Sequence, residues 1–161
     1  MGFFSIFSTF RKSNVFNLVF RSAQLIVALV VIGMYAVDLN TANKEDKYAD
    51  SKWVFAVTVG SLAAVTALIF SLASIFFQYR TVALLFAWDW VLTILFATLS
   101  GIFGSMYIGE KVEYESGVHR MKVAVGFDFT GLILWCVTAA FGTWWFVSER
   151  KAERRGRGNK A

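Results

Sequence analysis

Four long runs of apolar residues, separated by short polar segments, dominate the hydrophobic pattern of the chain. They cover about residues 18–37, 53–79, 81–109 and 123–148. A helix needs about 20 residues, at a rise of ~1.5 Å each, to cross the ~30 Å hydrocarbon core of a bilayer. The only charged residues inside the four runs are Arg21, Asp89 and Asp128. The pattern therefore predicts four membrane-spanning helices.

The composition supports a single membrane domain. Of the 161 residues, 57% are hydrophobic, and the mean hydropathy is +0.58. A soluble domain would be about 45–50% apolar. Proline is absent, so nothing is expected to break the helices. We predict an all-α fold, an integral membrane four-helix bundle over residues 15–148, with no room for a second domain.

The first fourteen residues have a helical pattern of their own. Phe3, Phe7 and Phe10 recur at i, i+4 and i+7 with Ile6 beside them, and polar residues take the other side. This spacing is typical of a short amphipathic helix that lies in the membrane interface. Residues 1–14 are therefore predicted to form an interfacial helix. The alternative is a frayed terminus that merely precedes the first span.

The distribution of Lys and Arg predicts the orientation. With four spans both termini share a side, and that side carries ten of the sixteen basic residues. The two polar loops on the opposite side carry six, diluted by acidic residues. Because basic residues accumulate on the cytoplasmic side, both termini are predicted to be cytoplasmic.

The C-terminal segment, residues 149–161, is predicted to be a basic cytoplasmic tail. Each Lys or Arg near an anionic membrane surface contributes about 1 kcal/mol of attraction. We therefore expect the tail to contact anionic inner-leaflet lipids. The residues expected to do so are Arg150, Lys151, Arg154, Arg155, Arg157 and Lys160.

The stretch LFAWDWVLTILF, residues 85–96, places Asp89 inside the third apolar run. A charge in the bilayer centre costs about 2.5–3.5 kcal/mol on insertion scales, so a partner is expected. Arg21 and Gln24 are at a similar depth on the first span, and we predict an intramembrane cluster of Arg21, Gln24 and Asp89. The alternatives are a neutral Asp89 bonded to Thr93, and a role in carrying protons or ions.

Asp128 is expected nearer the opposite membrane face, six residues past Lys122. The predicted depths separate it from Asp89 by roughly 8 Å along the membrane normal, which argues against a carboxylate dyad. Its expected partners are Tyr35, Tyr107 or Lys122. We predict that these residues form a structural polar contact at the outer end of the bundle.

Small residues recur every four positions in the second and third spans. Such rows allow helices to approach closely in lipid. They serve either packing inside the bundle or self-association; the spacing alone does not separate the two, and we expect packing inside the bundle. The rows are Gly60 and Ala64; Ala63, Ala67 and Ser71; and Ala97, Gly101 and Ser105.

Residues for catalysis are scarce. His119 is the only histidine and Cys136 the only cysteine, so neither a clustered metal site nor an intrachain disulfide is expected. No phosphate-binding loop, nucleophile elbow or zinc-protease motif is present. We expect no enzymatic activity, no cofactor and no nucleic-acid partner.

Three segments resemble the small fungal members of the MARVEL domain family. They are RSAQLIVALVVIGMYAVDL (residues 21–39), the WDWVL of the third run, and RMKVAVGFDFTGLILW (residues 120–135). The resemblance covers about residues 15–148. The matching positions are Arg21, Gln24, Asp89, Arg120, Lys122, Asp128 and Trp135.

The resemblance implies a non-enzymatic protein of the plasma membrane or of secretory vesicles. Such proteins organise membranes, lipid microdomains or vesicle traffic, and fungal relatives are associated with furrow-like plasma-membrane domains. A homo-oligomer, or contact with other membrane proteins, is an expected form of partnership. Two alternatives remain. One is a small transporter or channel subunit using Asp89 or Asp128, and the other is an accessory subunit of a larger membrane complex.

Overall fold

Four helices make up the part of the chain that the computed structural model describes, residues 12–44, 51–76, 82–109 and 116–158. The helices are α2 (Lys12–Lys44), α3 (Ser51–Phe76), α4 (Val82–Tyr107) and α5 (Ser116–Gly158). Each contains a stretch long and apolar enough to cross a membrane. The four stretches are Asn17–Thr41, Ser51–Ala73, Phe86–Tyr107 and Gly117–Ala152. The predicted class, an all-helical chain with four candidate spans, is confirmed.

Several helix ends differ from the predicted ones. The polar residues after position 37 remain helical as far as Lys44, where the hydroxyl of Thr41 donates to the carbonyl of Val37 at 3.0 Å. At the other end, α2 already begins at Lys12. The predicted interfacial helix over 1–14 falls almost entirely on residues 1–11, which lie outside the described residues.

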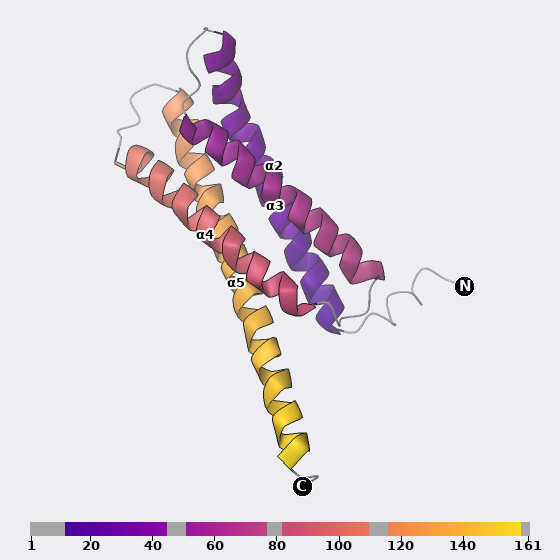
Figure 1. The fold of residues 1–161 in the computed structure, drawn as a ribbon. Coiled ribbons are helices and arrows are strands. Elements are labelled where there is room, and N and C mark those ends of the chain that lie inside the picture. The colour runs from indigo at the N-terminus through magenta and orange to yellow at the C-terminus, as the bar shows by residue number, and fades with distance from the viewer. Residues whose placement is uncertain (1–11, 45–50, 77–81, 110–115, 159–161) are drawn as a thin grey trace, which may run out of the picture.

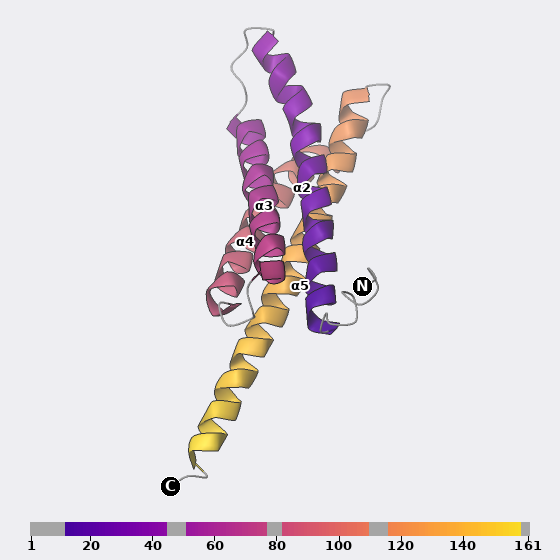
Figure 2. The same cartoon turned by 90° about the vertical axis from the view of Figure 1, so that its right-hand side faces the viewer.

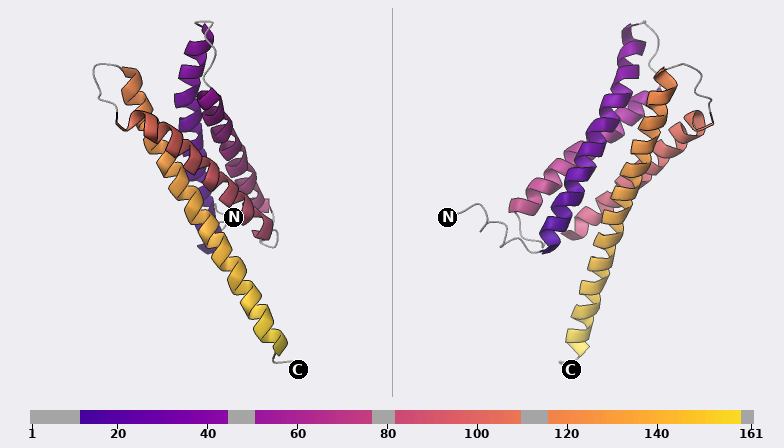
Figure 3. Two further views of the ribbon diagram at one scale, coloured as in Figure 1. Left: turned by 60° about the vertical axis from the view of Figure 1, so that its left-hand side comes forward. Right: turned by 180° about the vertical axis from the view of Figure 1, so that it is seen from behind.

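Consecutive helices run in opposite directions, as Figure 1 and Figure 3 show. α2 packs along α3 and α4 along α5. α2 also packs against α5, whereas α3 and α4 meet over only a small area. We call the end of the bundle where α2 begins and α5 ends the tail end, and the opposite end, where α2 and α4 finish, the loop end.

The predicted tail is not separate from the fourth span. α5 continues as one helix of 43 residues to Gly158, roughly 64 Å long. In Figure 2 its final part extends beyond the other helices at the tail end. Alanine, glutamate and arginine, which fill positions 152–155, are strong helix formers, and no proline interrupts them. The bundle therefore carries a helical extension where a separate tail was expected.

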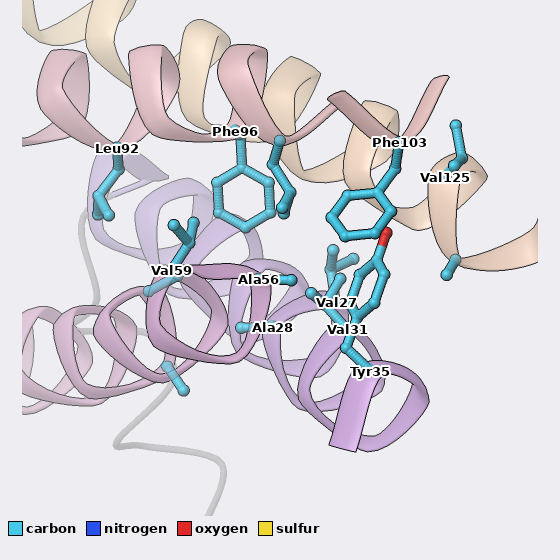
Figure 4. Close-up of a cluster of buried hydrophobic side chains, with 14 of the residues drawn as sticks. Val27, Ala28, Val31, Tyr35, Ala56, Val59, Leu92, Phe96, Phe103 and Val125 are labelled. Atoms are coloured by element: carbon cyan, nitrogen blue, oxygen red, sulfur yellow. The ribbon is translucent and has the colours of Figure 1, made fainter. Parts of the chain in front are cut away.

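The core lies along the line where α2, α4 and α5 face one another, with α3 closing one side. Figure 4 shows Phe96 and Phe103 of α4 pointing toward Val31 and Tyr35 of α2. All four side chains are fully buried. Because lipid is as apolar as these side chains, close packing and polar contacts, and not burial from water, hold such helices together.

Glycines allow two of the helix contacts. A Cβ on Gly60 of α3 would lie 2.8 Å from Cγ1 of Ile32, and one on Gly131 of α5 would lie 2.5 Å from the ring of Phe96. The two small-residue rows of α3 face inward: Gly60, Ala63, Ala64 and Ala67 are buried. On α3, therefore, the rows serve packing inside the bundle.

The row on α4 behaves differently. Ala97, Gly101 and Ser105 are all exposed on the outside of the bundle, and a Cβ on Gly101 would meet nothing within 4 Å. This row therefore does not pack inside the described bundle. Because its side chains are small, the row forms a flat strip on the outer surface of α4.

Substituting Gly131 by alanine is expected to destabilise the bundle by up to about 2 kcal/mol. Overpacking a core costs about 1–3 kcal/mol, and the gain in helix propensity offsets ~1 kcal/mol. The ring of Phe96 is completely buried, so it is packed on all sides. SDS-induced unfolding in mixed micelles, followed by circular dichroism, measures the loss. Gly126 on the same helix is the control, because a Cβ there meets nothing within 4 Å; equal losses at both glycines would contradict the packing described.

Candidate functional site

Asp89 and Arg21 form a buried, bidentate ion pair in the tail half of the bundle. Nη1 of Arg21 donates to Oδ1 of Asp89 at 3.0 Å, and Nη2 donates to Oδ2 at 2.7 Å. Arg21 is 5% exposed and Asp89 2%. Two parallel, charge-assisted hydrogen bonds satisfy both carboxylate oxygens and fix the relative orientation of the groups. The pair joins α2 to α4, two helices whose backbones do not approach each other within the described residues.

Aromatic rings from the remaining two helices flank the guanidinium of Arg21. Its Cζ lies 4.7 Å from the ring centroid of Phe70 on α3 and 5.3 Å from that of Trp135 on α5. A guanidinium at this distance from a ring is attracted to the ring face, and the attraction grows when water is excluded. Arg21 thus contacts all three other helices.

Gln24 extends the contact to α5. Its Oε1 accepts from Nη1 of Arg21 at 3.0 Å, and its Nε2 donates to the hydroxyl of Thr138 at 3.1 Å and to the carbonyl of Leu134 at 3.2 Å. The structure therefore brings together the three residues predicted to cluster, and it adds Thr138, which sequence reasoning missed. We use the name arginine cluster for Arg21, Gln24, Asp89, Thr138, Phe70 and Trp135.

The alternative partner considered for Asp89, Thr93, bonds to a different atom. The hydroxyl of Thr93 donates to the backbone carbonyl of Asp89 at 2.8 Å, and not to the carboxylate. This is the usual bond of a helical threonine to the preceding turn. The carboxylate is held by Arg21.

The two tryptophans beside Asp89 bond to different helices. Nε1 of Trp88 donates to the hydroxyl of Thr66 on α3 at 3.0 Å, and Nε1 of Trp90 donates to that of Thr143 on α5 at 3.0 Å. Successive side chains on a helix point about 100° apart, so an Asp that faces the centre directs its neighbours to the two flanking helices. Three consecutive residues of α4 therefore bond to three different helices. Two indole donors on either side of a buried acid, in the triplet WDW, indicate such bonds, but the bonds were not among our predictions.

A second polar contact lies in the loop half of the core. The hydroxyl of Tyr35 donates to Oδ2 of Asp128 at 2.6 Å, and both residues are fully buried. The ring of Tyr35 lies 4.5 Å from that of Phe103, which stacks with Tyr107 at 6.3 Å. Of the predicted partners, Tyr35 contacts Asp128 directly. Tyr107 joins the group through Phe103, and Lys122 is half-buried nearer the loop end of α5.

The two intramembrane acids are further apart than their predicted depths suggest. Phe96 packs on Gly131, which places Asp89 seven residues toward the tail end and Asp128 three residues toward the loop end. Ten residues correspond to roughly 15 Å along the helix axes. The larger separation arises because the helices are longer than the hydrocarbon thickness used for the prediction. The expectation that the acids do not form a dyad agrees with this spacing.

A third polar contact, between Asp38 and Arg120, was not predicted. A carboxylate oxygen of Asp38 on α2 accepts a hydrogen bond from Nη2 of Arg120 on α5, and the two groups form a salt bridge at the loop end. Their side chains are 16% and 33% exposed. The apolar run ends at about position 37, so the hydropathy pattern places Asp38 in the polar loop that follows. Asp38 is three residues from Tyr35, so the two side chains lie on one helix face. This spacing could have identified the contact between Asp38 and α5.

Polar contacts at three levels therefore join α2 to α5, whereas the closest approach of α2 to α3 is lined by small and apolar residues. We call this row of contacts the α2–α5 seam: Gln24 with Thr138, Tyr35 with Asp128, and Asp38 with Arg120. The arrangement fixes the register of two helices. Asp89 and Asp128 are enclosed among helices, whereas Asp38 is partly exposed at the loop end.

Other candidate chemistry is sparse in the described part of the chain. His119 is exposed and Cys136 is half-buried. Among the described residues, no group of three or more His, Cys, Asp or Glu side chains is placed to hold a metal ion.

The basic residues of the C-terminal segment lie on the extension of α5. Arg150 and Lys151 are exposed, and the guanidinium of Arg150 lies 4.4 Å from the ring centroid of Phe146. Phe146 in turn packs on Phe86 of α4 at 5.3 Å. Arg154, Arg155 and Arg157 belong to the last turns of the helix, and Lys160 lies outside the described residues.

Comparison with known proteins gives no family. The chain matches no protein-family model, and no curated protein sequence is similar to it. The likeness to MARVEL domain proteins therefore depends on the sequence segments quoted above.

Proposed function

We propose that this protein is a non-enzymatic, membrane-organising protein related to the MARVEL domain family. It acts in the plasma membrane or in secretory vesicles as a scaffold for lipids and other membrane proteins. Both termini are cytoplasmic, so the tail end of the bundle faces the cytoplasm. One observation carries the proposal: the Arg21–Asp89 pair is bidentate and nearly inaccessible.

A carboxylate that carries ions must exchange partners and must be reached by water. Both oxygens of Asp89 are already bonded to one guanidinium, and aromatic rings flank that guanidinium. Breaking such a pair by removing one partner typically costs about 3–5 kcal/mol, so the opened state that transport requires would be thinly populated. This geometry favours a structural role for the pair over the alternative of a small transporter or channel subunit.

Reconstitution in liposomes separates the scaffold from the transporter. The scaffold proposal predicts that wild-type protein, at a verified protein-to-lipid ratio, leaves proton, sodium and potassium leak rates at those of empty liposomes. A wild-type flux that is abolished by Asp89→Asn in correctly folded protein would contradict the proposal and support the transporter.

Neutralising basic residues of the helical extension is expected to weaken its contact with anionic lipid, by an amount that depends on their position. Neutralising Arg150 and Lys151 with glutamine should reduce the preference for phosphatidylserine more than neutralising Arg155 and Arg157. The second pair lies about 7–10 Å further along the helix, close to the Debye length of ~8 Å. Electron spin resonance of spin-labelled phosphatidylserine in nanodiscs measures the preference. Equal losses for the two double variants would mean that the extension lies along the surface, and no loss in either would contradict lipid contact.

The outward row of Ala97, Gly101 and Ser105 favours a second candidate, an accessory subunit or a homo-oligomer. Small residues every four positions allow another membrane helix to approach closely, and nothing in the described bundle covers them. Native mass spectrometry of protein released from nanodiscs distinguishes the two forms. A defined homo-oligomer supports self-association, whereas a monomer that co-purifies with a second membrane protein supports the accessory subunit.

A further inference from the structure

Asp128 differs from Asp89 and Asp38, the other two acids whose contacts between helices are described above. Asp89 and Asp38 each pair with an arginine. Asp128 is completely buried, its Oδ2 accepts one hydrogen bond from a neutral tyrosine, and its Oδ1 has no hydrogen-bond partner among the described residues. An ionised carboxylate in such a position would keep a full charge in an apolar interior with one neutral donor, which is strongly unfavourable.

Ser100 on α4 has a complementary deficiency. It is 2% exposed, and its hydroxyl has no hydrogen-bond partner among the described residues. The buried threonine hydroxyls of the bundle donate to a carbonyl of their own helix, as Thr66 does to Leu62 at 2.7 Å and Thr93 to Asp89 at 2.8 Å. Buried polar groups are rarely left unpaired. We therefore expect the hydroxyl of Ser100 to have a partner outside the backbone of its own helix.

The register of α4 and α5 places Ser100 and Asp128 at about the same level. Phe96 packs on Gly131, and the Cβ position of Gly104 lies 4.0 Å from both Val125 and Phe129. Ser100 is four residues from Phe96 and from Gly104, and Asp128 lies between Val125 and Gly131, so each is on the helix face that meets the other helix. Figure 4 shows Phe103 directed toward Tyr35 of α2, and Phe96 directed into the same core.

We propose that Asp128 is a proton-binding site: its carboxyl group carries a proton on Oδ1 at neutral pH, and the hydroxyl oxygen of Ser100 accepts that proton's hydrogen bond, directly or through one enclosed water. Protonation removes the charge and converts Oδ1 from an unpaired acceptor into a donor. Oδ2 remains the acceptor for Tyr35. A water requires two or more polar partners, and Asp128 and Ser100 supply two.

The groups around Asp128 are consistent with a neutral acid. From α2 the nearest polar group is Tyr35, and Asp38, one turn further, is already paired with Arg120. From α4 the face at this level presents Ser100 and, two turns further, Tyr107. On α5 itself Lys122 is six residues away, about 9 Å along the axis. The core around Asp128 is therefore uncharged when the carboxyl group carries its proton, and Tyr35 still donates to Oδ2 in that state.

Infrared spectroscopy of the full chain in lipid bilayers tests this site, independently of the proposed function. At neutral pH the wild type should show the carbonyl stretch of a protonated carboxylic acid. Carbon-13 labelling of aspartate should shift this band, and Asp128→Asn should abolish it, while the control Asp38→Asn leaves it unchanged. Tyr35→Phe and Ser100→Ala should each move the band to higher frequency, because each removes a hydrogen bond from the acid.

Two results would overturn the proposal. One is the absence of an aspartic acid band from folded wild-type protein at neutral pH. The other is a band that persists in Asp128→Asn. If Asp128→Asn does not fold, the two shifts decide, since a band unmoved by both Tyr35→Phe and Ser100→Ala belongs to a different group.

Discussion

Asp89→Asn should lower the free energy of unfolding by about 3–5 kcal/mol, which is the typical cost of leaving one member of a buried ion pair without its partner. The substitution keeps the shape of the side chain but leaves the guanidinium of Arg21 charged, 5% exposed and between two aromatic rings. Because that charge belongs to a residue that contacts all three other helices, we expect the whole bundle to be affected. SDS titration of protein in mixed micelles, monitored by circular dichroism, gives the loss.

Asp38→Asn is the matched control. It also removes an acid that pairs with an arginine, but Arg120 is 33% exposed at the loop end, where water reaches it. Such partly exposed pairs contribute about 0–1 kcal/mol. A loss at Asp38 as large as that at Asp89 would show that burial is not the cause of the difference.

The second large effect is expected at Trp135. Trp135→Ala should destabilise the bundle by about 3–5 kcal/mol, since it opens a cavity in the core and removes one of the two rings against the guanidinium of Arg21. Trp135 is 1% exposed. Thermal unfolding in nanodiscs, followed by circular dichroism, reports the shift in midpoint.

Trp144→Ala provides the comparison on the same helix. The ring of Trp144 is 64% exposed, so its removal should leave the unfolding midpoint close to that of the wild type. If the two alanine variants unfold at the same midpoint, Trp135 does not hold the arginine cluster in place.

The sequence was informative wherever a residue's depth in the membrane limited its partners. Asp89 and Arg21 are both charged and lie in apolar runs on the same half of the bundle, so few other arrangements could neutralise them. The same reasoning included Tyr35 among the partners of Asp128. Four long apolar runs without proline likewise left few alternatives to four helices.

Contacts that depend on direction and on helix ends were harder to predict. Trp88 and Trp90 carry donors, but only the rotation of α4 shows that they reach Thr66 and Thr143. Asp38 was missed because the limits of a span cannot be read from hydropathy when a polar residue stays helical through a contact with another helix.

The small-residue rows illustrate the same limit. A spacing of four residues defines a face of a helix but does not say which way that face points. The structure turns Ala63 and Ala67 of α3 inward and Ala97 and Gly101 of α4 outward. The helical extension of α5 was missed for another reason: its charges indicated exposure, and exposure alone does not distinguish a helix from an irregular tail.

A double-mutant cycle at Arg21 and Asp89 tests most directly whether this pair is the structural contact between α2 and α4. The free energies of unfolding of Arg21→Met, of Asp89→Leu and of the double variant are compared with that of the wild type. Each single substitution leaves an unpaired buried charge, whereas the double substitution leaves none. We predict that the double variant is more stable than either single variant, with a coupling energy of at least ~2 kcal/mol. Losses that simply add would contradict the account.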